Sequence, residues 1–284
     1  MPLFVLAFDH RTSLMRSFFG VEGEPSADVV ERARIAKRVI WQGLLRAVGD
    51  GRVSRSRAAA LVDATYGIEV IAAARREGIR VAVPVEASGR AELAFEQVEW
   101  RDRLEALDPA WAKVLVRYNP EGDAAMNARQ RAALGALVDH CEGSERGLML
   151  ELLVPPEPHH DMTVYETEVR PGLMVRAIEE MRDDGIAATV WKIEGLDRRR
   201  DCQRVAAAAG APCVVLGRGA DTDAVDRWLR AGAGVDGFDG FAIGRSIWWE
   251  PLRAMFAGET GEGEAAEAIA GAYVRAVSVY LGSG

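Results

Sequence analysis

Lysine is rare in this sequence, and two of its lysines occupy apolar stretches. The chain has 35 lysine and arginine residues, of which only Lys37, Lys113 and Lys192 are lysines. Lys37, in "RIAKRVI", fits the polar face of a helix, whereas Lys113 in "WAKVLVRY" and Lys192 in "TVWKIEGL" lie in runs typical of buried strands. A neutral lysine amine can condense with a ketone to an imine, which the permanently charged arginine cannot do. Both apolar positions are therefore candidates for Schiff-base chemistry.

Burial at such a position favours the neutral, nucleophilic form of Lys192. Desolvation lowers the pKa of an ammonium group from about 10.4 toward the working pH, and a second cation nearby, here Lys113, lowers it further. Glu151, in "LMLELLVPP", could move protons during the reaction. Structural roles stay open, because a strand-end lysine can be a solvated rim residue or a salt-bridge partner. Glu151 could likewise only neutralise Lys113 or Lys192.

Other polar residues follow apolar runs and could bind a substrate. Asp9, His10 and Arg11 come directly after "LFVLAF" and could act in catalysis or cap a barrel mouth. Arg245, in "AIGRSIWWEP", leads into a helix, and helix N-termini are frequent phosphate sites. Arg218, in "LGRGA", could act in the same way. Either arginine could instead be an ordinary surface residue.

A metal site is a weaker alternative. His159, His160 and Asp161 lie in "PPEPHHD" and offer metal ligands. Adjacent histidines on a loop are expected to point apart, and only His10 stands near another strand end. We therefore expect no metal and no organic cofactor.

Eight short apolar runs alternate with amphipathic stretches along the chain. The amphipathic stretches are typical of helices, and several end in glycine, a frequent helix terminator. Strand and helix alternation predicts a parallel sheet, and eight repeats within 284 residues predict an α/β fold of the (β/α)8 TIM-barrel type. We expect one domain over residues 1–284, with strands at residues 3–8, 59–64, 80–86, 112–117, 148–154, 188–194, 213–217 and 240–244.

A barrel of this type carries its active site at the C-terminal ends of the strands. Polar residues at these ends are Asp9, Asp63, Glu86, Lys113, Arg117, Glu151, Lys192, Glu194, Arg218 and Arg245. Side chains alternate along a strand, so Lys192 should point into the barrel while Trp191 and Ile193 face the helices. The same alternation places Glu151 on the inner face of its strand. The predicted site thus gathers around these two side chains.

The composition argues against several classes of protein. With 35 basic and 43 acidic residues the formal net charge is −8, so we expect neither nucleic acid nor a membrane surface as partner. Cys141, Cys202 and Cys213 form no C-x-x-C pair and are expected to be buried thiols. No basic leader precedes the first apolar run, and no G-x-G-x-x-G follows it. We expect a cytoplasmic location, and homo-oligomer formation stays open.

Five segments of the chain, in order, resemble one known family. They are "LAFDHR", "AKVLVRYNP", "LMLELLVPP", "VWKIEGL" and "GFAIGRSIWWEP". The chain is similar to the 5-dehydro-2-deoxyphosphogluconate aldolase domain that many bacteria carry fused behind a sugar kinase in myo-inositol catabolism. It resembles more distantly the class I tagatose-bisphosphate and sulfofructose-phosphate aldolases, which are barrels with a strand-six lysine. The resemblance implies cleavage of 5-dehydro-2-deoxy-gluconate 6-phosphate to dihydroxyacetone phosphate and malonate semialdehyde.

The resemblance also implies roles for individual residues. Lys192 would be the Schiff-base lysine, Glu151 the proton shuttle and Lys113 a neighbouring cation. Asp9 matches the acidic residue after the first strand. The implied substrate and phosphate contacts are Gly244, Arg245, Arg218, His10, Arg11 and Glu86.

The chain departs from the pattern of that family at two points. Gly195 stands where the fused enzymes tend to have proline, and we expect the domain to lack the kinase half. We therefore expect class I aldolase chemistry on a phosphorylated keto-sugar or keto-acid and leave the ketose open. A metal-dependent lyase and a barrel that binds sugar phosphate without turnover are the alternatives. Whether Lys113 or Lys192 forms the imine also stays open.

Overall fold

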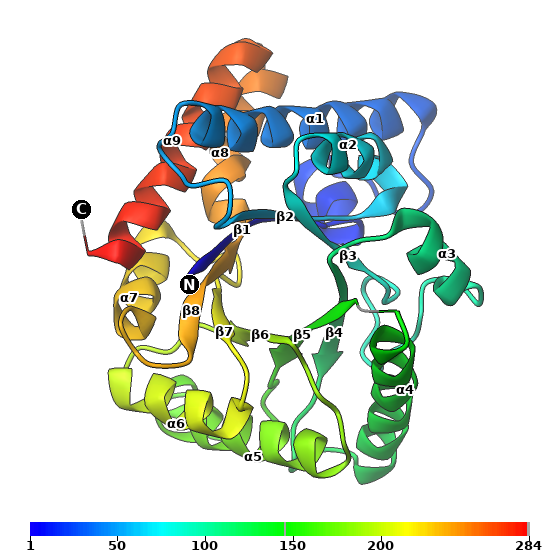
Figure 1. Ribbon diagram of the computed structural model, residues 1–284, viewed down its shortest axis with the longest axis vertical. Coiled ribbons are helices and arrows are strands. Elements are labelled where there is room, and N and C mark those ends of the chain that lie inside the picture. The colour runs from blue at the N-terminus through cyan, green and yellow to red at the C-terminus, as the bar shows by residue number, and fades with distance from the viewer. Residues whose placement is uncertain (145, 283–284) are drawn as a thin grey trace.

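Residues 1–144 and 146–282, which a computed structural model describes, form a closed barrel of parallel strands (Figure 1). Each strand pairs with the next along the chain, and the last pairs with the first. The strands are β1 (Leu3–Phe8), β2 (Ala58–Val62), β3 (Arg80–Pro84), β4 (Trp111–Arg117), β5 (Gly147–Leu153), β6 (Val190–Glu194), β7 (Cys213–Leu216) and β8 (Phe238–Ile243). The predicted (β/α)8 barrel is confirmed, with strand ends shifted by at most two positions.

Helices surround the barrel and connect its strands (Figure 1). They are α1 (Ala27–Gly49), α2 (Ala64–Arg76), α3 (Trp100–Leu107), α4 (Ala124–Glu142), α5 (Arg170–Asp183), α6 (Arg199–Ala209), α7 (Thr222–Gly232), α8 (Arg245–Phe256) and α9 (Glu262–Leu281). Short π-helical turns η1 (Leu14–Phe18) and η2 (Tyr165–Val169) lie in the loops before α1 and α5. The final helix α9 packs against α1 and α8, so the first and last helices close the outer ring together.

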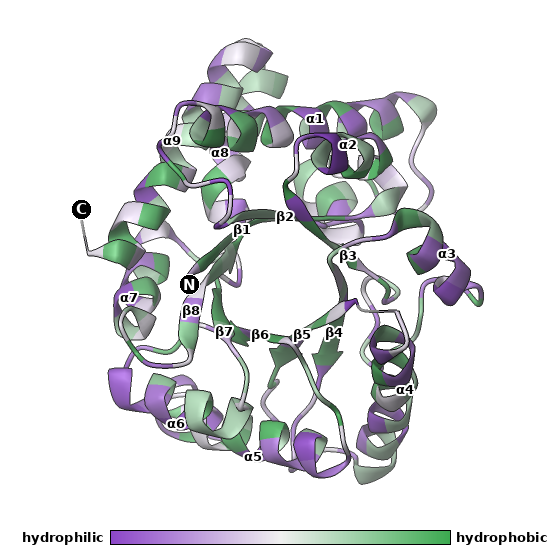
Figure 2. Ribbon diagram, in the orientation of Figure 1, coloured by the Kyte–Doolittle hydropathy of each residue, from purple (hydrophilic) through white to green (hydrophobic). Residues whose placement is uncertain are grey.

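The interior of the barrel is apolar on the N-terminal side of the cavity that the C-terminal strand ends form. Side chains alternate along β6, where Val190 faces the interior and Trp191 faces outward, donating a hydrogen bond to the carbonyl of Ala209 on α6. Figure 2 shows strands that are mainly hydrophobic, whereas the surrounding helices mix hydrophobic and hydrophilic residues. The interior cluster consists of Leu3, Val5, Ala7, Ala59, Leu61, Ala82, Trp111, Met149, Val190, Val214 and Ala242. The predicted alternation along β6 is therefore confirmed.

Several helices begin at an acidic residue that ends the preceding loop. The Asp63 carboxylate accepts a hydrogen bond from the Tyr66 amide at 2.8 Å at the start of α2. Asp123 and Asp221 cap α4 and α7 in the same way. The strand-to-helix loops are therefore anchored beside the carboxyl ends of the strands.

Helix α3 is an element that the sequence patterns did not predict. It has eight residues, and its N-cap residue Glu99 makes no side-chain capping bond. It ends at Asp108, whose φ of 45° is left-handed. A short helix without a capping signal gives too weak a pattern for prediction.

The structure also shows the state of the cysteines and the character of the helices. Cys141, Cys202 and Cys213 are free and buried, as predicted. Among residues 1–144 and 146–282, none of the helices combines the length and apolarity that crossing a membrane requires.

Candidate active site

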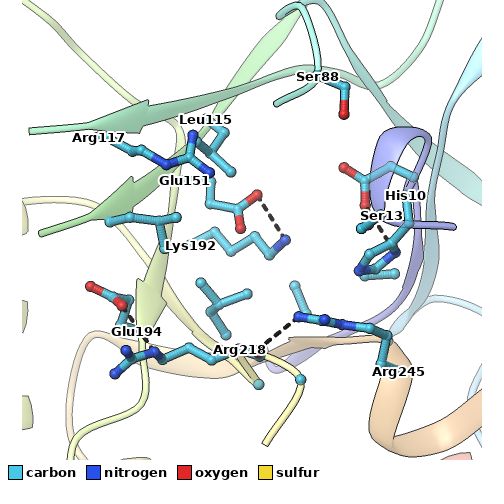
Figure 3. Close-up of a pocket in the computed structure, with 18 of the residues that line it drawn as sticks. His10, Ser13, Ser88, Leu115, Arg117, Glu151, Lys192, Glu194, Arg218 and Arg245 are labelled. Carbon is cyan, nitrogen blue, oxygen red and sulfur yellow. Dashed lines mark hydrogen bonds and ion pairs between the residues drawn. The ribbon is translucent and has the colours of Figure 1, made fainter. Parts of the chain in front are cut away.

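A cavity of about 610 Å³ opens at the C-terminal ends of the barrel strands. Seven of the eight strands contribute to its lining, either directly or through the loop that follows the strand, and β2 does not. Figure 3 shows Lys192 extending into it toward Glu151, with His10 and Arg245 facing the same space. The cavity therefore occupies the face where (β/α)8 enzymes carry out their chemistry.

Two lysines and one carboxylate form the centre of the site. Strand β5 lies between β4 and β6, and the register places Glu151 beside Lys192. Oε2 of Glu151 lies 2.9 Å from Nζ of Lys192 and 2.8 Å from Nζ of Lys113. The lysines are 3% and 2% exposed, respectively. The structure thus brings together the three residues that the sequence singled out first.

Lys113 is held by more carboxylates than Lys192. Its Nζ lies 3.1 Å from Oδ2 of Asp9 and 2.6 Å from Oε1 of Glu86, in addition to its contact with Glu151. Burial alone would lower the pKa of Lys113, but these three carboxylates raise it above its usual value. Lys113 therefore carries a positive charge in the folded protein. In the part of the chain that the structure describes, Lys192 forms an ion pair with one carboxylate, that of Glu151.

The carboxylates around the lysines differ in their acidity. Burial tends to raise the pKa of Asp9 and of Glu151, but the charges of Lys113 and Lys192 hold both below their usual values. For Glu86 burial prevails over Lys113, and its pKa is raised. Asp9 and Glu151 are therefore ionised, whereas Glu86 binds a proton more readily.

His10 and Arg11 have different surroundings, although they are adjacent in the chain. His10 lines the cavity, and burial lowers its pKa to about 3, so its imidazole is neutral. Arg11 does not line the cavity. Its guanidinium lies 2.6 Å from Glu96 and donates to the carbonyl oxygen of Glu86 at 2.7 Å. Arg11 thus lies behind the cavity wall, and its contact with substrate stays a prediction.

The loop after β7 places Arg218 between two acidic residues. Its guanidinium lies 2.5 Å from Glu166 and 3.1 Å from Glu194, so its charge is already paired. Arg218 has a φ of 52°, the left-handed backbone conformation that costs energy for residues with a Cβ. Its carbonyl oxygen accepts a hydrogen bond of 2.8 Å from Arg245.

Arg245 is the better candidate for an anion contact. Within the described chain it forms no ion pair with a carboxylate, and it stands at the start of α8. A Cβ at Gly219, whose φ is +73°, would lie 2.3 Å from its guanidinium. A Cβ at Gly244 would lie 2.1 Å from the carbonyl oxygen of Ala7. Both glycines therefore make room for the turns around Arg245, where a phosphate could also meet the helix N-terminus.

The cavity contains further residues beside those with a predicted role. Glu194 and Arg117 were predicted at strand ends without an assigned role, and alternation along β4 and β6 places them on the inner face. The loop residues Ser13, Arg16 and Ser88 also line the cavity. No strand periodicity reaches into these loops, so the sequence offered no signal for them.

Lys37 corrects one expectation, because it does not lie on a polar helix face. It is 1% exposed, and its Nζ lies 2.6 Å from Oδ1 of Asp63. The same amine donates to the carbonyl oxygens of Phe8 and His10, the latter at 2.9 Å. Lys37 therefore holds the backbone on both sides of Asp9.

The two adjacent histidines also differ from the prediction, since they do not point apart. Their ring centroids are 4.2 Å apart, and Nε2 of His159 and of His160 lie 3.2 and 3.1 Å from Oε2 of Glu121. The three side chains could in principle hold a metal. However, Nδ1 of His160 accepts a hydrogen bond from the Glu157 amide, so its proton is on Nε2, the atom that would have to bind the metal. None of the three lines the cavity.

The packing around Gly195 explains why this position holds glycine and not the proline that is frequent in the fused aldolases. A Cβ at this position would lie 2.0 Å from the ring of Trp228. The carbonyl oxygen of Gly195 also accepts a hydrogen bond of 2.8 Å from Arg170. Helix α7 therefore packs on the end of β6 so closely that only glycine fits.

Comparisons with known proteins agree with this fold. The structure is similar to a fructose-bisphosphate aldolase from Plasmodium falciparum, solved in a ternary complex with TRAP and a small-molecule inhibitor. The TM-score is 0.68 at 13% identity, covering 97% of this chain and 90% of that chain. No curated protein sequence matches the chain. The family model described as "Uncharacterized protein conserved in bacteria (DUF2090)" matches residues 1–283, and the chain belongs to that family.

Proposed function

We propose that the protein is a class I aldolase that cleaves a phosphorylated keto-sugar or keto-acid through an imine on Lys192. The observation that carries this proposal is the unequal pairing of the two cavity lysines. Three carboxylates keep Lys113 protonated, whereas Lys192 faces the cavity and, among the described residues, pairs with the carboxylate of Glu151 alone. A nucleophilic amine must be able to reach the substrate, and Lys192 extends into the cavity with fewer carboxylate partners than Lys113. The fold shared with a fructose-bisphosphate aldolase agrees with this class of chemistry.

The neighbours of Lys192 support each step of imine formation. Oε2 of Glu151 lies within hydrogen-bond distance of the amines of both Lys192 and Lys113. Glu151 is ionised, so it can take a proton from the amine of Lys192. It can then return the proton to the hydroxyl group that leaves as water. The resulting iminium accepts the electron pair of the adjacent C–C bond when that bond breaks.

The surroundings of Arg245 favour a substrate that carries a phosphate group. Arg245 has no carboxylate partner among the described residues and lies beside the first turn of α8, so it can hold a phosphate. A phosphate bound there fixes the distance between the ketone and Lys192, which lowers the entropic part of the barrier. The five sequence motifs favour 5-dehydro-2-deoxy-gluconate 6-phosphate as substrate. Tagatose-bisphosphate and sulfofructose-phosphate are the alternatives.

Trapping of the imine tests this proposal. The protein is incubated with dihydroxyacetone phosphate, reduced with borohydride and digested, and the modified peptide is identified by mass spectrometry. We expect the adduct on Lys192. An adduct on Lys113 would reverse the roles of the two lysines and keep the class of enzyme. The absence of any adduct would contradict the proposed chemistry.

A further inference from the structure

Glu86 has one carboxylate oxygen that the protein leaves unused. The side chain lines the cavity directly after β3, and the residue is 7% exposed. Its Oε1 lies 2.6 Å from Nζ of Lys113, whereas its Oε2 is buried without a hydrogen-bond partner among the described residues. Buried carboxylate oxygens are nearly always paired, because an unpaired one loses its hydration without compensation. Because the side chain lines the cavity, rotation of the carboxylate group can turn this unpaired oxygen toward a ligand that donates a hydrogen bond.

The other two carboxylates of the cluster are less suited to receive a substrate proton late in the reaction. Oε2 of Glu151 already lies between both lysines, at 2.8 and 2.9 Å, which places it at the imine nitrogen. Lys113 and Lys192 hold the pKa of Asp9 far below its usual value, despite burial, so Asp9 is a weak base. The pKa of Glu86 is raised by burial, and a carboxylate with a raised pKa accepts a proton more readily.

The position of Glu86 relative to Lys192 fits a particular proton. Successive contacts run from Lys192 to Glu151, then to Lys113 and then to Glu86, so Glu86 lies beyond the imine nitrogen along the cavity wall. In an aldol the hydroxyl that must lose its proton stands two carbons beyond the carbonyl carbon. We infer that Glu86 is the catalytic base that removes this hydroxyl proton when the C–C bond breaks. This inference rests on the proposed aldolase function and assigns the cleavage step within it.

The step is balanced in atoms and electrons. The hydroxyl proton moves to the carboxylate of Glu86, and the O–H electron pair forms the carbonyl of the departing aldehyde. The C–C bond breaks, and its electron pair moves into the iminium to give a neutral enamine on Lys192. In the reverse direction the protonated Glu86 returns its proton to the new alkoxide. The substrate must therefore be a β-hydroxy ketone, with its hydroxyl facing β3.

Two partial reactions separate Glu86 from its neighbours. Imine formation is measured as borohydride trapping with dihydroxyacetone phosphate, which requires no aldehyde. C–C bond formation is measured as condensation of dihydroxyacetone phosphate with malonate semialdehyde, and with glyceraldehyde 3-phosphate as a second aldehyde. General bases contribute about 10²–10⁴-fold to rate. We expect Glu86→Gln to slow condensation at least about 100-fold more than trapping, whereas Glu151→Gln slows both reactions alike.

Matched variants exclude a general disturbance of the cluster. Asp9→Asn removes another carboxylate from Lys113 and should not reproduce the selective loss of condensation. Glu86→Asp keeps a carboxylate and should retain more condensation than Glu86→Gln, and it replaces that variant in the test should Glu86→Gln fail to fold. Equal slowing of both reactions by the Glu86 variants, or the selective loss in Asp9→Asn, would overturn the inference. A wild-type protein that traps no ketone would contradict the proposed function. A wild-type protein that traps the ketone, with Glu86 variants that slow both reactions equally, would contradict the assignment of Glu86 alone.

Discussion

Two parts of the barrel interior are built from the same strands and differ in chemistry. We call the apolar interior cluster the floor and the cavity at the C-terminal strand ends the mouth. On β5, Met149 faces an apolar interior and Glu151, two residues further on, faces the lysines. On β6, Val190 and Lys192 stand in the same relation. The period of two along a strand lets one residue contribute to the core and the next inward residue contribute to the site. Inward-facing residues two positions apart on one strand therefore serve the packed core and the candidate active site, respectively.

The two regions also differ in how they are stabilised. The floor gains free energy from removing apolar surface from water, at about 25 cal/mol per Å². The mouth buries at least five ionisable side chains, and the cost of desolvating them is offset mainly by their mutual attraction. We therefore expect substitutions at the mouth to reduce activity more than stability, and substitutions at the floor to do the reverse.

Lys192→Met is the substitution with the largest expected effect on activity. Methionine has a similar length but cannot form an imine, so condensation of dihydroxyacetone phosphate with malonate semialdehyde should fall by a factor on the order of 10⁴ or more. Glu151 keeps its contact with Lys113, so the free energy of unfolding in urea should drop by less than about 1 kcal/mol. Lys192→Arg, which preserves the charge, should be equally inactive. Unchanged turnover in either variant would remove the basis of the proposed chemistry.

Lys37→Met should affect both regions, because Lys37 joins the core to the site. It leaves the carboxylate of Asp63 buried without its 2.6 Å partner, which should cost about 3–5 kcal/mol of unfolding free energy. It also frees the carbonyl oxygens beside Asp9, so kcat should fall more than KM rises.

The double variant Lys37→Met with Asp63→Asn is the control for this prediction. It removes both charges and leaves an asparagine that can still cap α2, so it should recover part of the stability without recovering kcat. Recovery of kcat together with stability would show that Lys37 has no positioning role.

Met149→Ala is the matching test at the floor. Met149 is fully buried, and a cavity left in its place should lower the free energy of unfolding by about 2–5 kcal/mol. Trapping of dihydroxyacetone phosphate by the folded fraction should stay close to that of the wild type. The exposed Met162→Ala should change stability by less than about 0.5 kcal/mol. A loss of trapping in Met149→Ala that is larger than its loss of stability would contradict the division between floor and mouth.

The barrel and the centre of its site could be predicted because both depend on local patterns. Each strand is a short apolar run, and alternation along β6 determines which way Lys192 points. Since parallel strands end on one face, inward residues late in neighbouring strands must meet. The meeting of Lys113, Glu151 and Lys192 follows from that rule.

Two side chains lie elsewhere than the sequence patterns placed them, because their partners are distant in sequence. Lys37 was placed on a polar helix face, but its partner Asp63 stands at the end of β2, and helix periodicity carries no information about that strand. Arg11 follows His10 directly, yet Glu96 from the loop after β3 draws it out of the cavity. Loop conformation, which brings such partners together, is not encoded in strand or helix periods.

The pH dependence of stability gives the smallest expected effect and tests how dry the mouth is. Burial lowers the pKa of His10 from 6.5 to about 3 in the folded protein. Between pH 6.5 and about pH 5 the unfolded chain therefore binds a proton at His10 that the folded protein does not, and stability falls as the pH falls. The slope from this one residue should be about 1 kcal/mol per pH unit. The urea midpoint of His10→Asn should accordingly depend less on pH in this range, and since the other histidines remain in the variant, the difference isolates His10. Equal slopes for wild type and variant would mean that water reaches the imidazole, and that the mouth is less well desolvated than the buried lysines require.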